Sequence, residues 1–404
     1  MPANIVPKTP RKRRAQPLGF PTGPPVFPVG MSVLVAVASA CAAHPPKAPR
    51  APSEPEPQVI ETARLIVTPR DAASVEELFA GAQRLLEDGR LQEAVRDFDR
   101  VSRLDPEGPW ALEAAHRAAL AVEDAGQHRD AAQRFERLAL GHPREGLARD
   151  ALVRSIRLYL FLEEWQRGGR LGQVLLSRYE DLVPLEQIVG SSARALAFLA
   201  RAELEEAQHY VGLGRRVIDE HRLDSAGVIP RDLAQVFFAL GELNRLRAEA
   251  IRLDAPEHFV QRFEKRAQLL LDAQGAYSDV MRAHDAHWSA MAGYRVGELY
   301  GSLHREVMEM PRPPGADTER RRLLFEGALR LRYSVLLDKG LAMFEHTLAM
   351  AERTGEQSAW VERTQRAKRQ LQQAAEAERA AIDALPFSRA DLQAVLREIQ
   401  GRQP

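Results

Sequence analysis

Residues 78–106 read LFAGAQRLLEDGRLQEAVRDFDRVSRLDP, and residues 115–143 repeat the same pattern as AHRAALAVEDAGQHRDAAQRFERLALGHP. The small, apolar and proline positions recur 37 residues apart: Leu78, Gly81, Ala82, Leu85, Gly89, Ala94, Phe98 and Pro106 match Ala115, Ala118, Ala119, Val122, Gly126, Ala131, Phe135 and Pro143. Apolar residues three and four apart indicate helices. A pattern that returns at a fixed interval predicts a chain of repeated helical units.

The residue types at these positions suit a two-helix unit that stacks on its copies. Gly81 and Ala94 are small enough to let the two helices of a hairpin approach closely. Phe98 can fill the space between hairpins, and Pro106 can end the second helix. Since each hairpin covers its apolar face only against its neighbours, we expect a continuous stack.

This pattern resembles the tetratricopeptide repeat (TPR), which implies an all-α fold, an α-solenoid of helical hairpins. A third unit keeps Leu152, Tyr159 and Gly168, but Gly172 replaces the aromatic residue. We therefore expect three TPR units over residues 73–184. A capping box formed by Ser74 and Glu77 is expected to start the first helix. The resemblance is closest to TPR lipoproteins of bacterial envelopes, such as those of outer-membrane protein assembly or the Tol–Pal system.

The remaining sequence stays helical in its periodicity but loses the clean repeat. We expect divergent helical hairpins over 185–310, and long helices with a capping helix over 311–404. Aromatic and glycine positions between Trp288 and Tyr300 resemble TPR proteins of the gliding-motility machinery. The final helix is expected to start at Ser388, with Asp391 in capping position. Its apolar stripe, which either closes the solenoid or meets a partner, contains Leu392, Val395, Leu396 and Ile399.

Composition excludes several classes of protein. The 56 basic residues equal the 56 acidic ones, so no global basic excess favours nucleic acid as a partner. A single cysteine excludes an internal disulfide framework and a multi-cysteine zinc site. Many good helix formers and an aromatic content of only 6% favour an all-α protein.

The first residues carry signals of targeting. The basic cluster Arg11–Arg14 is followed by the short apolar run Val29–Ala40, which is too short to span a bilayer but suits the core of a secretory signal. Small residues then lead directly to Cys41, and this junction resembles the lipobox of bacterial lipoproteins. We therefore expect a lipoprotein signal over residues 1–40 and a Pro-rich tether over 41–72.

The lipobox resemblance implies that Cys41 is lipidated and becomes the mature N-terminus. Several acyl chains there would hold the protein at a membrane without a spanning helix. By the same resemblance, Ala42 in place of an Asp favours the outer membrane, with the protein on its periplasmic face. The alternative is a soluble cytosolic TPR adaptor or regulator with a disordered N-terminal region, in which Cys41 is incidental.

The resemblance to TPR proteins also assigns a partner-binding groove to the first helix of each unit. The groove positions map to Glu76, Phe79, Gln83, Leu86 and Glu87, then to Glu113, His116, Leu120, Glu123 and Asp124, and then to Asp150, Val153, Arg157, Leu160 and Phe161. This set is acidic with apolar spots, so an apolar or basic segment of another envelope protein is the expected partner. Core positions for Leu86, Leu120 and Leu160 are the alternative.

Catalytic and metal-binding motifs are scarce. The sequence lacks H-E-x-x-H, a phosphate-binding loop and G-x-S-x-G, so we expect a non-enzymatic scaffold without cofactor or small-molecule substrate. His284 and His287 lie three residues apart near Asp285, but no matching second pair stands nearby, and no metal site is expected.

Overall fold

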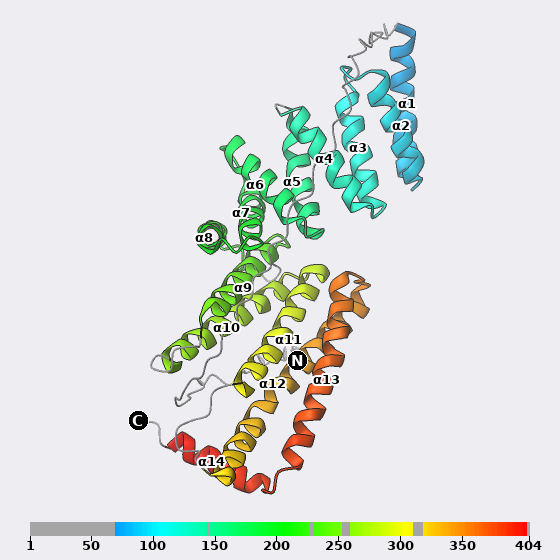
Figure 1. The fold of residues 1–404 in the computed structure, drawn as a ribbon. Helices are drawn as coiled ribbons and strands as arrows, with labels where there is room; N and C mark the ends of the chain where they lie inside the picture. Colours follow the sequence, from blue (N-terminus) through cyan, green and yellow to red (C-terminus); the bar gives the residue numbers. More distant parts are fainter. Residues whose placement is uncertain (1–68, 144, 226–228, 253–258, 310–317, 402–404) are drawn as a thin grey trace, which may run out of the picture.

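The computed structural model describes residues 69–143, 145–225, 229–252, 259–309 and 318–401. Our predictions for the segment 1–40, for Cys41 and for all but the last residues of 41–72 concern residues outside this part. Within the described residues the chain forms helices and no strand (Figure 1). The helices are α1 (Pro69–Glu87), α2 (Leu91–Leu104), α3 (Ala111–Asp124), α4 (His128–Gly141), α5 (Gly146–Phe161), α6 (Trp165–Arg178), α7 (Pro184–Leu199), α8 (Leu204–His221), α9 (Leu233–Ala250), α10 (Phe259–Arg282), α11 (Ala286–Met308), α12 (Glu319–Thr354), α13 (Ala359–Asp383) and α14 (Arg389–Gly401).

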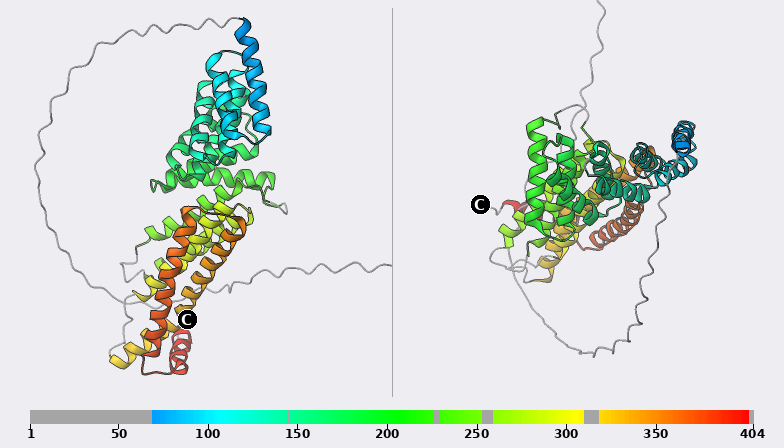
Figure 2. Two further views of the ribbon diagram at one scale, coloured as in Figure 1. Left: turned by 90° about the vertical axis from the view of Figure 1, so that its right-hand side faces the viewer. Right: turned by 90° about the horizontal axis from the view of Figure 1, so that it is seen from above.

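Helices α1 to α8 form consecutive helical hairpins that stack one on the next (Figures 1 and 2). The all-α, TPR-like solenoid predicted from the sequence is therefore confirmed. Its first helix begins at Pro69, whereas Ser74 lies inside the helix, so the predicted capping box at Ser74 is wrong. Proline is tolerated in a first helical turn because the N–H it lacks has no partner there.

In each of these hairpins, one residue at the turn between the two helices has a left-handed backbone conformation. In the first two hairpins it is Gly89 (φ 73°) and Gly126 (φ 74°). In the next two it is Glu163 (φ 58°) and Ala202 (φ 57°), residue types that adopt this conformation only at a cost. The solenoid thus has a fourth hairpin, α7–α8, whose turn carries no glycine to mark it in the sequence.

Glycines explain why the third unit lacks the aromatic residue of the first two. A Cβ on Gly172 of α6 would lie 2.8 Å from the carbonyl oxygen of Gly190 in α7, and one on Gly169 would lie 2.3 Å from the Cβ of Ala197. The two helices therefore approach too closely for a phenylalanine. Close contact through small residues takes the place of the aromatic wedge.

Two helices lie inside the molecule instead of on its surface. Buried residues occupy most of the circumference of α7 and α9, including Val189 and Phe198 in α7 and Val236 in α9. A helix that is apolar all round is covered all round. One apolar cluster runs without a break from Ala119 in α3 through both helices to Trp360 in α13.

The C-terminal half is a bundle of long helices, which lies below the solenoid in Figure 1 and in the left view of Figure 2. Glycines again set the closest contact, because a Cβ on Gly297 of α11 would lie 2.2 Å from the Phe344 ring of α12. The helix α14 packs on the start of α12, where Leu392 is fully buried against Gly327. Among the described residues, no helix combines the length and apolarity needed to cross a membrane.

Candidate functional site

The sequence-predicted groove positions have very different exposures. The exposed ones are Glu76, Glu87, Asp124 and Asp150. The partly exposed ones are Gln83, Leu86, Glu113, Leu120, Glu123, Arg157 and Phe161. The buried ones are Phe79, His116, Val153 and Leu160. The assignment of the first two groups to a partner-binding groove stays a prediction.

Phe79 and Leu160 cannot present their side chains to a partner, so their assignment to the groove is wrong. The Phe79 ring packs between the rings of Phe98 and Trp110, with centroid distances of 5.5 and 4.8 Å, and belongs to the core of the first hairpin. Leu160 is 0% exposed and borders Gly168 of α6. Val153 is buried in the same way. These residues face the second helix or the next hairpin, which are the other two surfaces a first helix must cover.

His116 is buried as well, and its side chain links two helices of the chain. Its Nε2 lies 2.9 Å from Oδ2 of Asp150, which joins α3 to α5, and its ring meets Phe135 edge-on at 5.7 Å. The hydrogen bond with His116, together with one donated by Arg154, holds the pKa of Asp150 below its usual value. The pair helps to fix the spacing of successive first helices.

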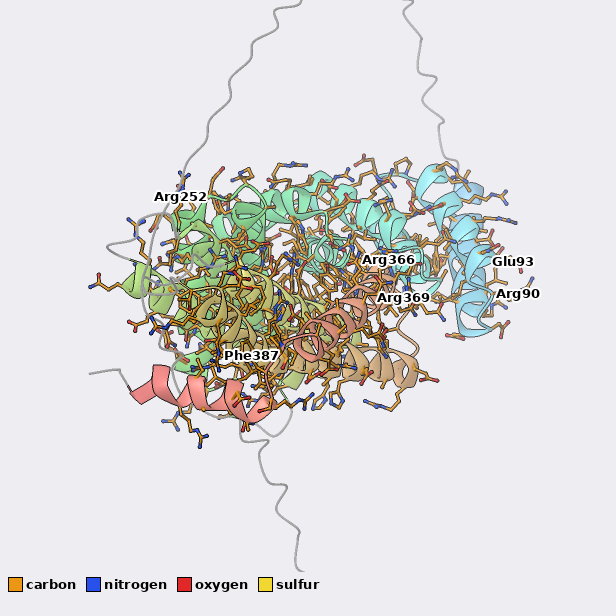
Figure 3. The ribbon with its side chains drawn as sticks, turned by 60° about the horizontal axis from the view of Figure 1, so that its bottom comes forward. Arg90, Glu93, Arg252, Arg366, Arg369 and Phe387 are labelled. Atoms are coloured by element: carbon orange, nitrogen blue, oxygen red, sulfur yellow. The ribbon has the colours of Figure 1, made fainter. Side chains whose placement is uncertain are left out.

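Ion pairs within and between helices neutralise part of the acidity expected on this face. Arg117 pairs with Glu113 at 2.7 Å within α3, and Arg154 of α5 reaches back to Glu123 at 3.2 Å. In the view of Figure 3, side chains that end in nitrogen and side chains that end in oxygen both project from the helices. At the outer end of the solenoid, Arg90 and Glu93 form one such pair at 2.6 Å.

The third unit is covered by the C-terminal half of the same chain. Arg157 donates two hydrogen bonds, of 3.0 and 2.7 Å, to the carboxylate of Asp232 at the start of α9. The Phe161 ring lies 4.2 Å from the ring of His287 in α11. Both side chains are therefore already in contact with their own chain, and the open part of the predicted groove lies mainly on α1 and α3, with Asp150 at the start of α5.

Glu163 is the centre of this junction. Its Oε1 accepts a hydrogen bond of 2.8 Å from the indole Nε1 of Trp360, at the start of α13. Arg363 lies 3.7 Å from the other carboxylate oxygen and stacks on the Trp360 ring at 4.3 Å. Beside this contact, Trp165 approaches Trp288 of α11, with 6.3 Å between ring centroids. We call the contact of Glu163 with Trp360 and Arg363 the junction latch.

Metal-binding groups do not gather in the described part of the chain, where no cluster of three or more His, Cys, Asp or Glu side chains could hold an ion. His284 is exposed and left-handed (φ 54°), just before α11, whereas His287 is buried within it. Asp285, between them, caps α11 by accepting a hydrogen bond of 3.0 Å from the backbone N–H of Trp288. Asp285 therefore serves the start of α11, and His287 belongs to the junction.

A buried charge network joins α9, α10 and α11. The Glu242 carboxylate accepts a hydrogen bond of 2.5 Å from the Tyr277 hydroxyl and one of 2.7 Å from Arg245, and lies 2.9 Å from Arg295. Burial raises the pKa of Glu242, but Arg295, Arg245 and Tyr277 outweigh burial and leave that pKa below its usual value. Because the carboxylate is held by three partners at once, we interpret this network as structural. A glutamate inside the apolar run of α9 was its only sequence signal.

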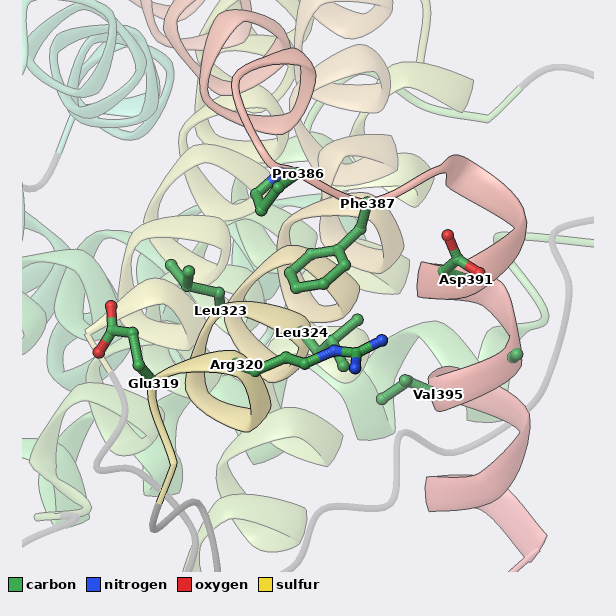
Figure 4. A pocket seen from close by; sticks show the side chains of 9 residues that line it. Glu319, Arg320, Leu323, Leu324, Pro386, Phe387, Asp391 and Val395 are labelled. Atoms are coloured by element: carbon green, nitrogen blue, oxygen red, sulfur yellow. The ribbon is translucent and has the colours of Figure 1, made fainter.

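The end of the bundle carries a crevice lined by both apolar and charged side chains (Figure 4). Ser388 and Asp391 cap α14 together, so Asp391 takes part in the cap as predicted. The Ser388 hydroxyl oxygen accepts a hydrogen bond from the backbone N–H of Asp391, and Oδ2 of Asp391 accepts hydrogen bonds from the N–H and the hydroxyl of Ser388. Leu392 packs against the end of the bundle, as expected if the apolar stripe of this helix closes the fold instead of meeting a partner. Val395 instead borders a cavity of about 710 Å³, together with Leu323, Leu324 and Phe387.

Solved structures of repeat proteins are similar to this chain. No model of a protein family matches the chain, and no curated protein matches it. Among solved structures, a tetratricopeptide repeat protein from Parabacteroides merdae is similar, with 13% identity, a TM-score of 0.38, and coverage of 74% of this chain and 99% of that one. The TPR-like repeats of a putative kinesin light chain from Podosopora anserina are 17% identical, with a TM-score of 0.32, and cover 52% and 97% of the respective chains. The fold assignment rests on the hairpins of this chain itself.

Proposed function

We propose that this chain is a non-enzymatic scaffold that binds other proteins of a bacterial cell envelope and is held at the outer membrane by lipid on Cys41. The observation that carries the binding role is the solenoid itself. Its stacked hairpins hold the partly exposed side chains of α1 and α3, such as Gln83, Leu86 and Leu120, on a rigid surface. Stacked hairpins commonly use such extended surfaces for binding.

The expected partner is a segment with apolar and basic residues. Leu86 and Leu120 offer apolar area, while Glu76 and Glu87 remain exposed at the two ends of the α1 groove positions. An amphipathic helix or an extended peptide with a basic residue near each of these carboxylates would be complementary. The complex organised in this way would serve outer-membrane assembly, cell-wall coordination or gliding motility, as the sequence resemblances suggest.

Affinity purification from the native host tests the binding surface. The Glu76→Lys, Glu87→Lys double variant should lose at least one partner that wild type retains. Glu77→Lys is the control, because Glu77 is also exposed on α1 but points about 100° away from Glu76. Identical sets of co-purified proteins from all three chains would contradict the proposal.

Fractionation tests the anchor separately. Wild type should be found with the outer membrane and should incorporate a labelled fatty acid, whereas Cys41→Ser should do neither. If both chains are recovered from the cytoplasm without label, the anchor is wrong and the soluble cytosolic adaptor is the remaining reading. This result would leave the test of the α1 surface unaffected.

A further inference from the structure

The second helices of the first three hairpins, α2, α4 and α6, carry a row of residues opposite to their packing face. In α2 the buried residues Ala94 and Phe98 belong to the packing face. Arg96 and Arg100 follow them by two residues, which is a rotation of about 200° around the helix, and Arg103 lies one turn further. All three arginines are exposed, so the row points away from the core.

The repeat places the same row on α4 and α6. Counted from the left-handed residue of each turn, Gly89, Gly126 or Glu163, the row occupies the seventh, eleventh and fourteenth positions. We call these nine positions the outer stripe. They are Arg96, Arg100 and Arg103 on α2, Gln133, Arg137 and Leu140 on α4, and Arg170, Val174 and Ser177 on α6. Five of the nine are arginines, and none is acidic.

Side-chain contacts join the three helices into one surface. Arg134 of α4 lies 2.7 Å from the carboxylate of Asp99 in α2, and Arg178 of α6 donates a hydrogen bond of 3.1 Å to the backbone carbonyl of Ala139 in α4. Packed helices lie about 10 Å apart. The outer stripe is therefore about 20 Å long across the helices and about 10 Å wide along each of them.

The arginines of the outer stripe have no acidic partner in the chain as described. Exposed arginines at the hairpin turns do have one, since Arg90 pairs with Glu93 and Arg201 with Glu203, both at 2.6 Å. Within the part of the chain that the structure describes, none of the five stripe arginines takes part in an ion pair or hydrogen bond. Asp97, which lies beside the stripe, offsets one of the five charges at most.

The excess of positive charge ends at α6. On α8 the equivalent positions are His209, Leu213 and Arg216. Carboxylates are also exposed on that helix, namely those of Glu205, Glu206, Asp219 and Glu220. The basic surface is therefore confined to α2, α4 and α6.

We propose that the outer stripe binds an acidic segment of another protein, which crosses α2, α4 and α6 in extended conformation. A length of about 20 Å corresponds to about six residues at about 3.3 Å each, so a carboxylate at every third residue meets one helix after another. The guanidinium group suits this partner because its planar fork matches a carboxylate with two parallel hydrogen bonds.

The composition of the outer stripe favours a protein segment over the other polyanions. None of its nine residues is aromatic, so the stripe offers no ring on which the bases of a nucleic acid could stack. Leu140 is the one large apolar side chain of the stripe that is exposed, at 45%, which gives little apolar area for insertion into a bilayer. The inference adds a second interaction surface, opposite in charge to the one proposed on α1, and depends neither on that surface nor on the anchor.

The test uses the full-length Cys41→Ser chain, which removes any contribution of lipid, and a displayed library of random peptides of about ten residues. Selection should enrich peptides with several carboxylates, whose binding weakens as salt is added. The Arg100→Glu, Arg137→Glu double variant should bind these peptides about tenfold or more weakly, because it replaces two attractive contacts by repulsive ones. Its thermal unfolding should match wild type, since both side chains are exposed.

The Arg90→Glu, Arg201→Glu double variant is the matched control. It changes the net charge by the same amount, but at exposed arginines that already have partners, and it should leave binding of the acidic peptides unchanged. Failure to enrich acidic peptides, or an equal loss of binding in both double variants, would overturn the proposal. Binding to phosphatidylglycerol vesicles that the Arg100→Glu, Arg137→Glu change abolishes would also overturn it, since a lipid surface would then be the occupant.

Discussion

Trp360 donates its indole N–H to Glu163 over 2.8 Å, although 197 residues separate the two in the chain. Glu163 adopts the left-handed conformation (φ 58°) that the first two hairpins give to Gly89 and Gly126. A non-glycine residue there costs about 1 kcal/mol. Strained residues persist where the surrounding structure requires them. Here the Glu163 carboxylate accepts a hydrogen bond from Trp360 and pairs with Arg363, contacts that a glycine could not make.

Breaking the junction latch should loosen the start of α13. Trp360→Phe removes the hydrogen bond to a charged acceptor and should lower the free energy of unfolding by about 2 kcal/mol. Glu163→Gly loses the same bond but relieves the left-handed strain, so its free energy of unfolding should change by less than about 1 kcal/mol. Both variants should speed amide hydrogen exchange at residues 359–366, measured by mass spectrometry.

The equivalent turn of the preceding unit provides the control. Gly126→Ala places a side chain at φ 74° and should cost about 1 kcal/mol, without any change of exchange at α13. Trp360→Phe should cost less in the Glu163→Gly background than in wild type, because the pair interacts directly. Additive effects would mean that Glu163 and Trp360 are not coupled.

The sequence predicted the fold where local rules control it. Gly89, Phe98 and Pro106 each recur one unit later, and the helices between them follow from spacing alone. The fourth hairpin was expected only as a divergent one and not as a further unit of the repeat, because Ala202 occupies the turn position without glycine's signal. The third unit also lacks the aromatic residue that Phe98 and Phe135 provide in the first two, because α6 packs closely against α7 at Gly172.

The candidate site was less predictable because non-local contacts decide it. Groove positions transferred from a repeat pattern assume that the face of each first helix stays open. Nothing near Arg157 or Phe161 in the sequence announces that Asp232 and His287 will cover them. The one available signal was Glu163 at a position that the first two units give to glycine, followed closely by Trp165.

The close approach of α6 and α7 predicts opposite effects of one substitution at two glycines. Gly172→Ala would place its Cβ 2.8 Å from a backbone oxygen, which cannot move without shifting α7. We expect a loss of about 1–3 kcal/mol from overpacking. Gly212→Ala on α8 meets no atom within 4 Å and should gain about 0.5–1 kcal/mol from helix propensity. Thermal unfolding followed by circular dichroism should show Tm shifts of opposite sign, and a shared sign would refute this packing.

The buried network around Glu242 predicts a large loss of stability on neutralisation. Glu242→Gln keeps the shape of the side chain but leaves Arg295 and Arg245 without their buried countercharge, which should cost about 3–5 kcal/mol at pH 7. The control is Glu249→Gln, because the Glu249 carboxylate also pairs with Arg245 at 2.7 Å but is half exposed. Its loss should stay below about 1 kcal/mol in urea denaturation.

The same network makes stability depend on pH in the acid range. Because the folded-state pKa of Glu242 lies below its usual value, the folded protein binds fewer protons than the unfolded chain. The stabilisation is therefore complete above the unfolded-state pKa, and it is lost as the pH falls from there through the folded-state pKa. Glu242→Gln, which cannot titrate, should show a shallower decline of unfolding free energy between about pH 5 and pH 3 than wild type. If the two chains declined in parallel over that interval, Glu242 would not be the ionised centre of the network.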